Sequence, residues 1–191
     1  MNCQDNRCFV VRHGETEWSL HHRHTGRTDL PLLPTGMVQA EGLQISLSAH
    51  EFRSVLTSPL ARARETCRLA GFGDVAEIEL DLAEWDYGFL EGLTTDEISR
   101  ERPQWDLFAD GAPGGETIQE VAVRVDRVIE RIRATDGDVV CFAHGHVLRV
   151  LAARWLGLDP REGGCFVLDP ASVSILGWER ANPVVVRWNL T

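Results

Sequence analysis

Two short apolar runs, far apart in the chain, both end in a histidine. The first run covers residues 8–11 and leads into Arg12-His13, and the second covers 138–143 and leads into His144. Runs of this length and composition are typical of buried strands. Because ligands bind at the carboxyl ends of strands in an open α/β sheet, we expect His13 and His144 to lie side by side at such an edge.

The residues next to these histidines suit an anionic ligand. Arginine offers a planar fork of donors that matches a phosphate, and histidine is a common nucleophile or proton carrier near neutral pH. We expect Gly14 to let the backbone turn sharply and approach a ligand closely. A helix predicted over 145–156 begins at Gly145, so its first amides are expected to point at a bound phosphate. For Arg12-His13 taken alone, a strand that merely ends in two polar residues is the alternative.

Charge composition restricts the chemistry further. The chain carries a formal net charge of −10, which disfavours nucleic acid and anionic membranes as partners. All 19 basic residues are arginine. The absence of lysine excludes Schiff-base and pyridoxal chemistry and the lysine of a P-loop. Any phosphate pocket in this chain is therefore built from arginine, histidine and backbone amides.

Length and cysteine content predict a single domain over residues 1–191, in the cytoplasm. A chain of 191 residues is long enough to bury a substantial core, and no apolar run reaches transmembrane length. The cysteines are odd in number and lack Cys-x-x-Cys spacing, which favours reduced thiols over disulfides or a zinc site. They are Cys3, Cys8, Cys67, Cys141 and Cys165.

Apolar periodicity predicts alternating helices and strands elsewhere. We expect helices over 35–49, 60–70, 118–134 and 145–156, and strands over 52–57, 78–82, 172–178 and 184–188, with the last two forming a hairpin at the sheet edge. The core side of the first helix is assigned to Met37, Val38, Leu43, Ile45 and Leu47. Residues 19–32 are polar and unperiodic, and we expect a loop there, whose histidine-rich edge at His21 to His24 could lie over an anion pocket.

Two further segments carry residues suited to chemistry. Ser58 and Pro59 are predicted as N-cap and first residue of a helix, which places Arg62 in a first turn that favours an anion. Residues 84–92 combine three acids with three aromatic residues. A carboxyl group such as Glu84 can have a raised pKa against aromatic rings and act as a general acid, and a plain surface turn is the alternative.

Taken together, four motifs resemble the histidine phosphatase superfamily, also called the phosphoglycerate mutase-like family. They are Arg12-His13-Gly14-Glu15-Thr16-Glu17-Trp18, Ser58-Pro59-Leu60-x-Arg62, Glu84-x-x-Tyr87-Gly88 and Ala143-His144-Gly145-His146, in the family's order and with Thr25-Gly26 between the first two. The resemblance covers essentially the whole chain. It implies an α/β fold, a three-layer α/β/α sandwich with a mostly parallel central sheet.

The resemblance also implies phosphoryl transfer that needs no metal and no cofactor. His13 would attack phosphorus and become a phosphohistidine, Arg12, Arg62 and His144 would hold the phosphoryl oxygens, and Glu84 would serve as proton donor and then activate water. Glu91 would fix the loop. The substrate-binding residues that it implies, besides Arg12 and Arg62, are Ser19, Thr25, Gly26, Tyr87, Gly145 and His146. Many members carry asparagine where this chain has Ser19, whose hydroxyl donates one hydrogen bond with shorter reach.

Within the family, the chain resembles the phosphatase branch. Cofactor-dependent mutases carry a longer, lysine-containing segment between the Glu84 and His144 motifs, and here that segment is short, although Arg100 and Arg102 remain. The branch includes broad-specificity acid phosphatases and enzymes of the sedoheptulose 1,7-bisphosphatase type. We therefore expect a phosphomonoester hydrolase whose partner is a small phosphorylated metabolite, such as a sugar phosphate or a phosphoglycerate-like compound.

Three other functions remain open, and so does the segment that determines which substrate is selected. The chain could be a cofactor-dependent phosphoglycerate mutase, a non-catalytic module that binds a phosphorylated ligand, or a metallohydrolase built on His21, His22 and His24. The aromatic, glycine-rich stretch 100–116 is expected to be a loop or lid that selects substrate, or else a plain surface connection. Six tryptophans would permit a homodimer interface, although most could be core.

Overall fold

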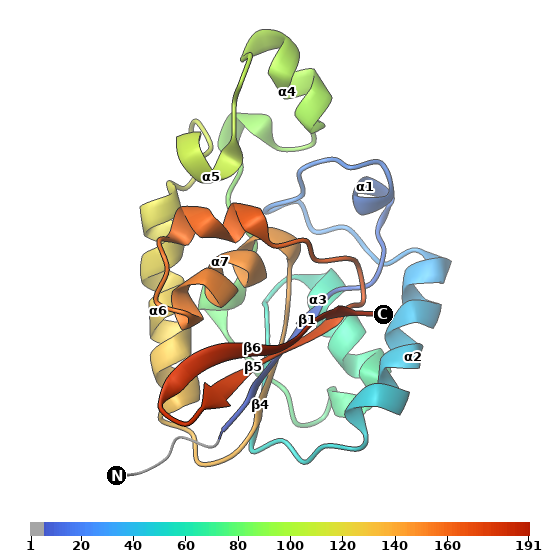
Figure 1. Cartoon of the computed structure of the whole chain (residues 1–191). Coiled ribbons are helices and arrows are strands. Elements are labelled where there is room, and N and C mark those ends of the chain that lie inside the picture. Colours follow the sequence, from blue (N-terminus) through green and yellow to red (C-terminus); the bar gives the residue numbers. More distant parts are fainter. Residues whose placement is uncertain (1–5) are drawn as a thin grey trace.

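The computed structural model describes residues 6–191 and confirms an α/β fold around one six-stranded sheet (Figure 1). The strands are β1 (Cys8–Arg12), β2 (Ser54–Thr57), β3 (Glu77–Ile78), β4 (Val139–Ala143), β5 (Val173–Glu179) and β6 (Asn182–Leu190). Their spatial order is β3-β2-β4-β1-β5-β6. The first four of these run parallel, and the predicted antiparallel hairpin of β5 and β6 forms one edge.

Side chains that alternate along β1 build a core on each face of the sheet. Cys8 and Val10 pack with residues of α6 (Ile118–Arg133) and α7 (Gly145–Trp155). Phe9 and Val11 pack with residues of α2 (Pro34–Leu47) and α3 (Ala61–Cys67). Figure 1 shows these two helix pairs on opposite sides of the sheet, which is the predicted three-layer arrangement.

Helix α2 buries a different set of residues from the one predicted. Met37, Val38 and Ile45 are exposed by 40%, 67% and 84%, so assigning them to the core was wrong. The buried stripe recurs every three or four residues and consists of Gly36, Ala40, Leu43 and Leu47. At Gly36 the helix lies against the chain beside it, because a Cβ atom there would lie 2.2 Å from the Glu15 carbonyl oxygen.

Other predicted boundaries shift for local reasons. The strand expected over 78–82 ends at Ile78, and a 3₁₀ helix, η2 (Leu80–Leu82), follows it. Helix α3 begins after Leu60, so Ser58 is not its N-cap, and a π-helical turn, η1 (Arg68–Phe72), continues it. A short helix, α1 (Glu17–Leu20), occupies the start of the expected loop.

The stretch 100–116 is more ordered than a free loop. It begins at the end of α4 (Thr95–Glu101) and contains α5 (Leu107–Asp110), and both helices lie beyond the end of the sheet in Figure 1. Leu107 and Phe108 belong to the same buried cluster as α6 and α7. This stretch is therefore packed onto the molecule, although its mobility as a lid is not tested.

The cysteines and the helices bear on the predictions of reduced thiols and of no transmembrane segment. Cys3 lies outside the described residues, and the other four cysteines are free thiols. In the part of the chain from 6 to 191, no helix has the length and apolar character needed to cross a membrane.

Candidate active site

Three parallel strands end at the same edge of the sheet and bring distant residues together there. The His13 amide donates to the Ala143 carbonyl at 2.9 Å, and the Ser58 amide donates to the Phe142 carbonyl at 2.9 Å. These contacts continue the pairing of β1 and β2 with β4 by one residue. As a result, the rings of His13 and His144 lie 5.1 Å apart between centroids, side by side as predicted.

His13 is held in the form that a nucleophile requires. Its Nδ1–H donates to the Gly14 carbonyl at 2.7 Å, which leaves the Nε2 lone pair free of a proton. Burial, and then the neighbouring charges of Arg62 and Arg12, lower the pKa of His13 well below its usual 6.5. The imidazole is therefore neutral at physiological pH, with one nitrogen available.

Gly14 allows a close backbone contact that the sequence did not indicate. A Cβ atom at this position would lie 2.4 Å from the Gly36 carbonyl oxygen, at the start of α2. The close approach that the structure shows is therefore to the backbone of α2, and the predicted approach to a ligand stays a prediction. The Gly14 amide donates to the Thr66 hydroxyl at 3.0 Å, so this packing fixes the segment that carries His13.

Arg12 presents an unneutralised charge beside His13. Its Nη1 donates to the Leu168 carbonyl at 2.5 Å, and its buried Nε has no hydrogen-bond partner in the part of the chain that the structure describes. Burial lowers the pKa of the guanidinium. A buried donor without a partner costs free energy, and an anionic ligand at this place would satisfy it.

Arg62 is fully buried and serves as the anchor of the second histidine. Its Nε donates to His144 Nδ1 at 3.1 Å, and its terminal nitrogens donate to the carbonyls of Thr25, Gly26 and Thr28 at 2.9 Å each. Since arginine only donates, Nδ1 of His144 must accept, and the proton of His144 lies on Nε2.

The Nε2–H of His144 points to the Ser58 hydroxyl at 2.7 Å. Burial, and then the charge of Arg62, lower the pKa of His144 well below its usual value. His144 is therefore a neutral hydrogen-bond donor with a fixed tautomer. Sequence reasoning placed Ser58 at a helix cap and missed this contact.

Glu84 joins the segment after η2 to the start of α7. Its Oε1 accepts from the amides of Trp85 and Val147 at 2.9 Å, and its Oε2 accepts from the His146 amide at 3.0 Å. Two amides of the first turn of α7 are thus taken by this carboxylate. The expectation that these amides point at a phosphate is wrong for His146 and Val147, although Gly145 does line the cavity described below.

A group of rings forms the wall next to Glu84. The Tyr87 hydroxyl lies 2.5 Å from His146 Nδ1, and the His24 ring lies 4.9 Å from that of Tyr87. Burial raises the pKa of Tyr87 well above its usual value and lowers that of His146 well below, so both groups are neutral. Burial likewise lowers the pKa of His24 to about 4.

The polar groups of the loop residues implied by the resemblance are mostly engaged in hydrogen bonds within the protein. The Ser19 hydroxyl donates to the Thr16 carbonyl at 3.0 Å and accepts from the Thr16 amide at 2.8 Å. The Gly26 amide donates to the Glu91 carboxylate at 2.9 Å, and so does the Thr28 amide at 3.0 Å. This confirms that Glu91 fixes the loop, which in turn presents the carbonyls that hold Arg62.

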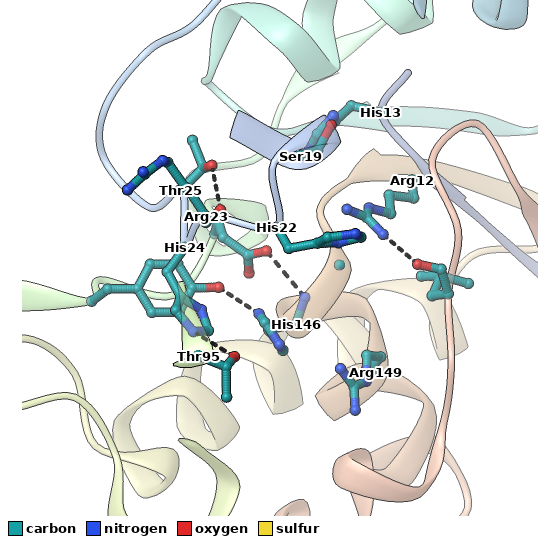
Figure 2. A pocket seen from close by; sticks show the side chains of 14 residues that line it. Arg12, His13, Ser19, His22, Arg23, His24, Thr25, Thr95, His146 and Arg149 are labelled. Carbon is teal, nitrogen blue, oxygen red and sulfur yellow. Dashed lines mark hydrogen bonds between the residues drawn. The ribbon is translucent and has the colours of Figure 1, made fainter. Parts of the chain in front are cut away.

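The site opens as one cavity of about 210 Å³ (Figure 2). The predicted residues that line it are Arg12, His13, Ser19, Thr25, Glu84, Tyr87, Gly145 and His146. Arg62, Gly26 and His144 lie behind this lining, joined to one another by the hydrogen bonds of Arg62. The side chains at the strand ends therefore form two layers, of which only the first faces the cavity.

Sequence reasoning missed several residues of the cavity wall. Thr95, Arg149 and Leu168 line it without having been predicted, whereas His22, Arg23 and His24 belong to the histidine-rich loop edge that was expected over an anion pocket. A signal for Arg149 was present, because it follows His146 by three residues and so shares its helix face. For Thr95 and Leu168 the sequence held no such signal.

Arg149 is the second arginine of the cavity without a carboxylate partner. Its Nε donates to the Gly163 carbonyl at 3.1 Å and its Nη2 to the Gly164 carbonyl at 3.0 Å, and the guanidinium stacks 4.6 Å from the centre of the Phe108 ring. No ion pair joins it to a carboxylate within residues 6–191. By contrast, Arg23 is paired with Glu97 at 3.1 Å.

The histidine-rich loop does not gather metal ligands. His21 pairs with Glu17 at 3.1 Å and lies outside the cavity lining, whereas His22 and His24 line it. Among residues 6–191, no group of three or more His, Cys, Asp or Glu side chains is placed to hold a metal ion. Within the described residues, His21, His22 and His24 therefore do not form the ligand cluster that the metallohydrolase alternative needs.

Comparisons with known proteins agree with this geometry. The model of the histidine phosphatase superfamily (branch 1) matches residues 8–191. An acid phosphatase of Mycobacterium tuberculosis is 39% identical over 94% of this chain and 90% of its own length. A sedoheptulose 1,7-bisphosphatase of Saccharomyces cerevisiae is 38% identical over 80% of this chain and 68% of its own length.

A solved structure gives the same result for the fold. The product of an open reading frame of Mycobacterium tuberculosis superimposes with a TM-score of 0.93, at 37% identity, over 97% of this chain and 98% of that one. The likeness therefore extends over nearly the whole of both chains. Family model, relatives and structure agree, and the chain belongs to the histidine phosphatase superfamily, as an enzyme with phosphatases among its relatives.

Proposed function

We propose that the protein is a metal-independent phosphomonoester hydrolase that works through a phosphohistidine on His13. The observation that carries this proposal is the state of His13. Its Nδ1–H is fixed on the Gly14 carbonyl, and its free Nε2 belongs to a cavity that also contains the unneutralised guanidinium of Arg12. A neutral nucleophile beside a fixed positive charge is what attack on a phosphate ester requires.

In the first proposed step, Nε2 of His13 forms a bond to phosphorus while the bond from phosphorus to the ester oxygen breaks. The leaving alkoxide takes a proton from Glu84. Oxygen Oε2 of Glu84 accepts only one amide, whereas Oε1 accepts two, so Oε2 is the oxygen with room for that proton. In the second step, Glu84 takes a proton from water as the water attacks the phosphohistidine, which releases phosphate and restores His13.

The charge of the transferred group would be balanced in two layers. Arg12 would bind phosphoryl oxygens directly, because its Nε lacks a partner. Arg62 would act by its charge and by fixing His144, since its donors already hold protein groups. Although His144 lies behind the lining, its ring centroid is 5.1 Å from that of His13, so an oxygen of the phosphoryl group on His13 would replace Ser58 as acceptor of the His144 Nε2–H.

The cavity supports a small, doubly charged substrate. A volume of about 210 Å³ suits a metabolite rather than a macromolecule. Arg149 offers a second unpaired guanidinium to a carboxylate or a second phosphate, as in phosphoglycerate-like compounds or sugar bisphosphates. A cytoplasmic location and a homodimer stay predictions. Size-exclusion chromatography would test the homodimer.

Hydrolysis of p-nitrophenyl phosphate with and without EDTA tests this proposal. We expect turnover that resists EDTA and that falls by at least about 10⁴-fold in His13→Ala, because the nucleophile is lost. His21→Ala is the matched control, since His21 lies outside the cavity lining.

Other outcomes would favour the alternatives. Turnover that EDTA removes would indicate metal chemistry. Interconversion of phosphoglycerates that depends on a bisphosphate would indicate a mutase. Binding of phosphate esters without turnover of any ester would indicate a binding module.

A further inference from the structure

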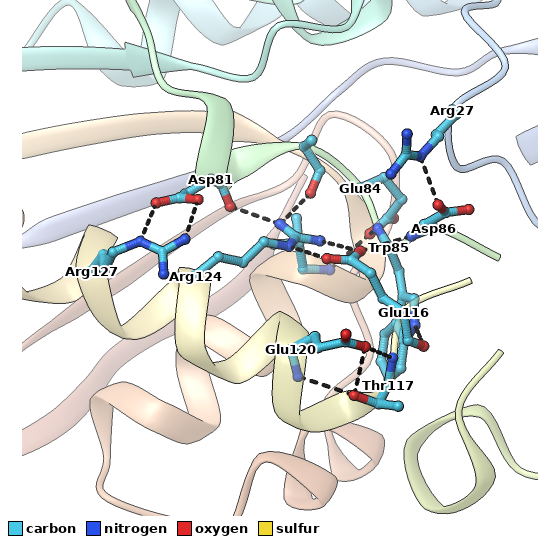
Figure 3. Close-up of polar contacts among 12 residues, drawn as sticks. Arg27, Asp81, Glu84, Trp85, Asp86, Glu116, Thr117, Glu120, Arg124 and Arg127 are labelled. Carbon is cyan, nitrogen blue, oxygen red and sulfur yellow. Dashed lines mark hydrogen bonds and ion pairs between the residues drawn. The ribbon is translucent and has the colours of Figure 1, made fainter. Parts of the chain in front are cut away.

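The segment that carries Glu84 is held from α6 by one buried arginine. Nη1 of Arg124 donates to the carbonyls of Asp81 and Ala83, at 2.7 Å and 2.6 Å (Figure 3). Arg124 is only 8% exposed. Ala83 directly precedes Glu84 and Asp81 lies three residues before it, so Arg124 fixes the backbone on the N-terminal side of Glu84.

Glu116 fixes the backbone on the other side. Its Oε2 accepts from the Asp86 amide at 2.9 Å, and its backbone carbonyl accepts from the indole N–H of Trp85 at 2.8 Å. The Glu116 amide in turn donates to the Asp86 carbonyl at 2.9 Å. Every residue from 83 to 86 except Glu84 itself thus has a polar group bound to Glu116 or Arg124.

The two anchors are also bound to each other. Nε of Arg124 donates to Oε1 of Glu116 at 2.8 Å, and Nη2 donates to Oε2 at 3.1 Å, a bidentate pair (Figure 3). Both side chains are largely buried: that of Arg124 is 10% exposed and that of Glu116 is 22% exposed. A bidentate, desolvated pair holds its atoms more precisely than an exposed pair does.

Close backbone packing makes this arrangement specific. A Cβ atom on Gly115 would lie 2.0 Å from the Asp86 carbonyl oxygen, so only glycine allows Glu116 to reach the segment. Glu116 also ends the stretch whose Phe108 stacks against Arg149 at the cavity. The pair therefore connects the wall of the cavity to the segment of Glu84.

We propose that Glu116 and Arg124 are positioning residues for Glu84 and set the alignment of its carboxyl group with the leaving oxygen. The inference rests on the proposed function, in which Glu84 donates the proton. Proton transfer requires hydrogen-bond distance, and a displacement of about 1 Å can cost about 10²-fold in rate. Neither residue lines the cavity, so both act through the backbone around Glu84.

Leaving groups of different basicity separate positioning from general stability. The nitrophenolate of p-nitrophenyl phosphate is a stable anion and needs no proton to depart, whereas the alkoxide of glycerol 2-phosphate does need one. We therefore compare kcat/KM for the two esters, because this ratio reports the step in which the ester bond breaks. In Glu116→Gln and Arg124→Lys we expect kcat/KM for glycerol 2-phosphate to fall about tenfold more than that for p-nitrophenyl phosphate.

The matched control is Asp126→Asn, which breaks another bidentate pair of the same helix. Asp126 accepts from Arg154 at 2.9 Å and 3.0 Å, and within residues 6–191 neither side chain forms a hydrogen bond with residues 81–86. Thermal unfolding of each variant verifies folding. Glu116→Gln keeps an oxygen acceptor and Arg124→Lys keeps the charge, so each variant tests the pair if the other proves unstable.

The outcomes distinguish this inference from the proposed function. Equal losses for both esters in Glu116→Gln and Arg124→Lys, or the same selective loss in Asp126→Asn, would overturn the positioning role. Glu84→Gln tests the function separately, with an expected selective loss of about 10²- to 10⁴-fold for the alkyl ester. If Glu84→Gln shows no selectivity for the leaving group, the proton-donor assignment itself is wrong.

Discussion

The floor and the rim of the cavity are built from different kinds of structure. The floor comprises Arg12 and His13, with Ser58, Arg62 and His144 behind them. These residues come from the ends of β1, β2 and β4 and from the first turn of α3, and backbone carbonyls or other floor residues fix each one. The floor is therefore preorganised before any ligand arrives.

The rim comprises His22, Arg23, Thr95 and Arg149, which come from a loop and from helices outside the sheet edge. His22 and Thr95 are exposed. Arg149 is held by two carbonyls of a separate 3₁₀ helix, η4 (Pro160–Cys165). Under the proposed function, the difference predicts that the floor would act on every ester, whereas the rim would select among esters.

The largest expected effect is at the floor. Arg62→Lys should lower kcat/KM for every phosphate ester by more than about 100-fold, because one ammonium group cannot replace a fork that binds His144 and three carbonyls. Steady-state kinetics on p-nitrophenyl phosphate would measure it. Arg64→Lys, on the exposed side of the same helix, is the control and should match wild type. A loss confined to a single ester would contradict the distinction between floor and rim.

His24, at the boundary of the two regions, should make stability depend on pH. Burial lowers its pKa to about 4, below the unfolded value of about 6.5. Between these values the unfolded chain binds a proton that the folded chain does not, so the free energy of unfolding falls as pH drops from about 6.5 towards about 4. The contribution of His24 is about 2–3 kcal/mol.

Urea titrations at several pH values would measure this dependence. His24→Gln should reduce the fall, whereas His21→Gln, which changes an exposed histidine, should leave it intact. An unchanged pH dependence in His24→Gln would show that His24 is not desolvated in solution.

At the rim, Arg149→Met should change selectivity rather than turnover. We expect KM for 3-phosphoglycerate or a sugar bisphosphate to rise about tenfold or more, because their second anionic group loses a charged partner. The kcat/KM for p-nitrophenyl phosphate should stay within about threefold. Arg154→Met, farther along α7 and outside the cavity lining, serves as control. An equal loss of kcat/KM for all esters would show that Arg149 acts like the floor residues and does not select among esters.

The smallest expected effect is at Ser19. Its hydroxyl already bonds to the Thr16 backbone, so Ser19→Ala should change kcat/KM by less than about threefold and cost about 0.5–1 kcal/mol of stability through the lost cap at α1. Steady-state kinetics would measure the change in kcat/KM, and thermal unfolding would measure the loss of stability. A loss of tenfold or more in kcat/KM would show that the hydroxyl leaves Thr16 to bind substrate.

Most of the floor could be predicted from the sequence, because the signals were local. Each strand is a short apolar run that ends at its functional residue, and parallel strands must end at the same edge of a sheet. The pairing of His13 with His144 follows from that. The rim could not be predicted in the same way, since Thr95 and Leu168 reach the cavity only through the packing of α4 and of the chain that precedes β5.

By itself, the sequence determined the strand ends that carry the histidines, and its motifs indicated the family, whose resemblance implied the three layers. Local patterns of apolar residues specify the strand ends regardless of what lies next to them in space. Only the tertiary structure decided which neighbour each polar atom contacts. Gly14 makes room for Gly36, Arg62 binds His144 and loop carbonyls, and Glu84 takes the amides of α7. Hydrogen bonds between residues distant in the chain depend on the packed backbone, and no local pattern encodes them.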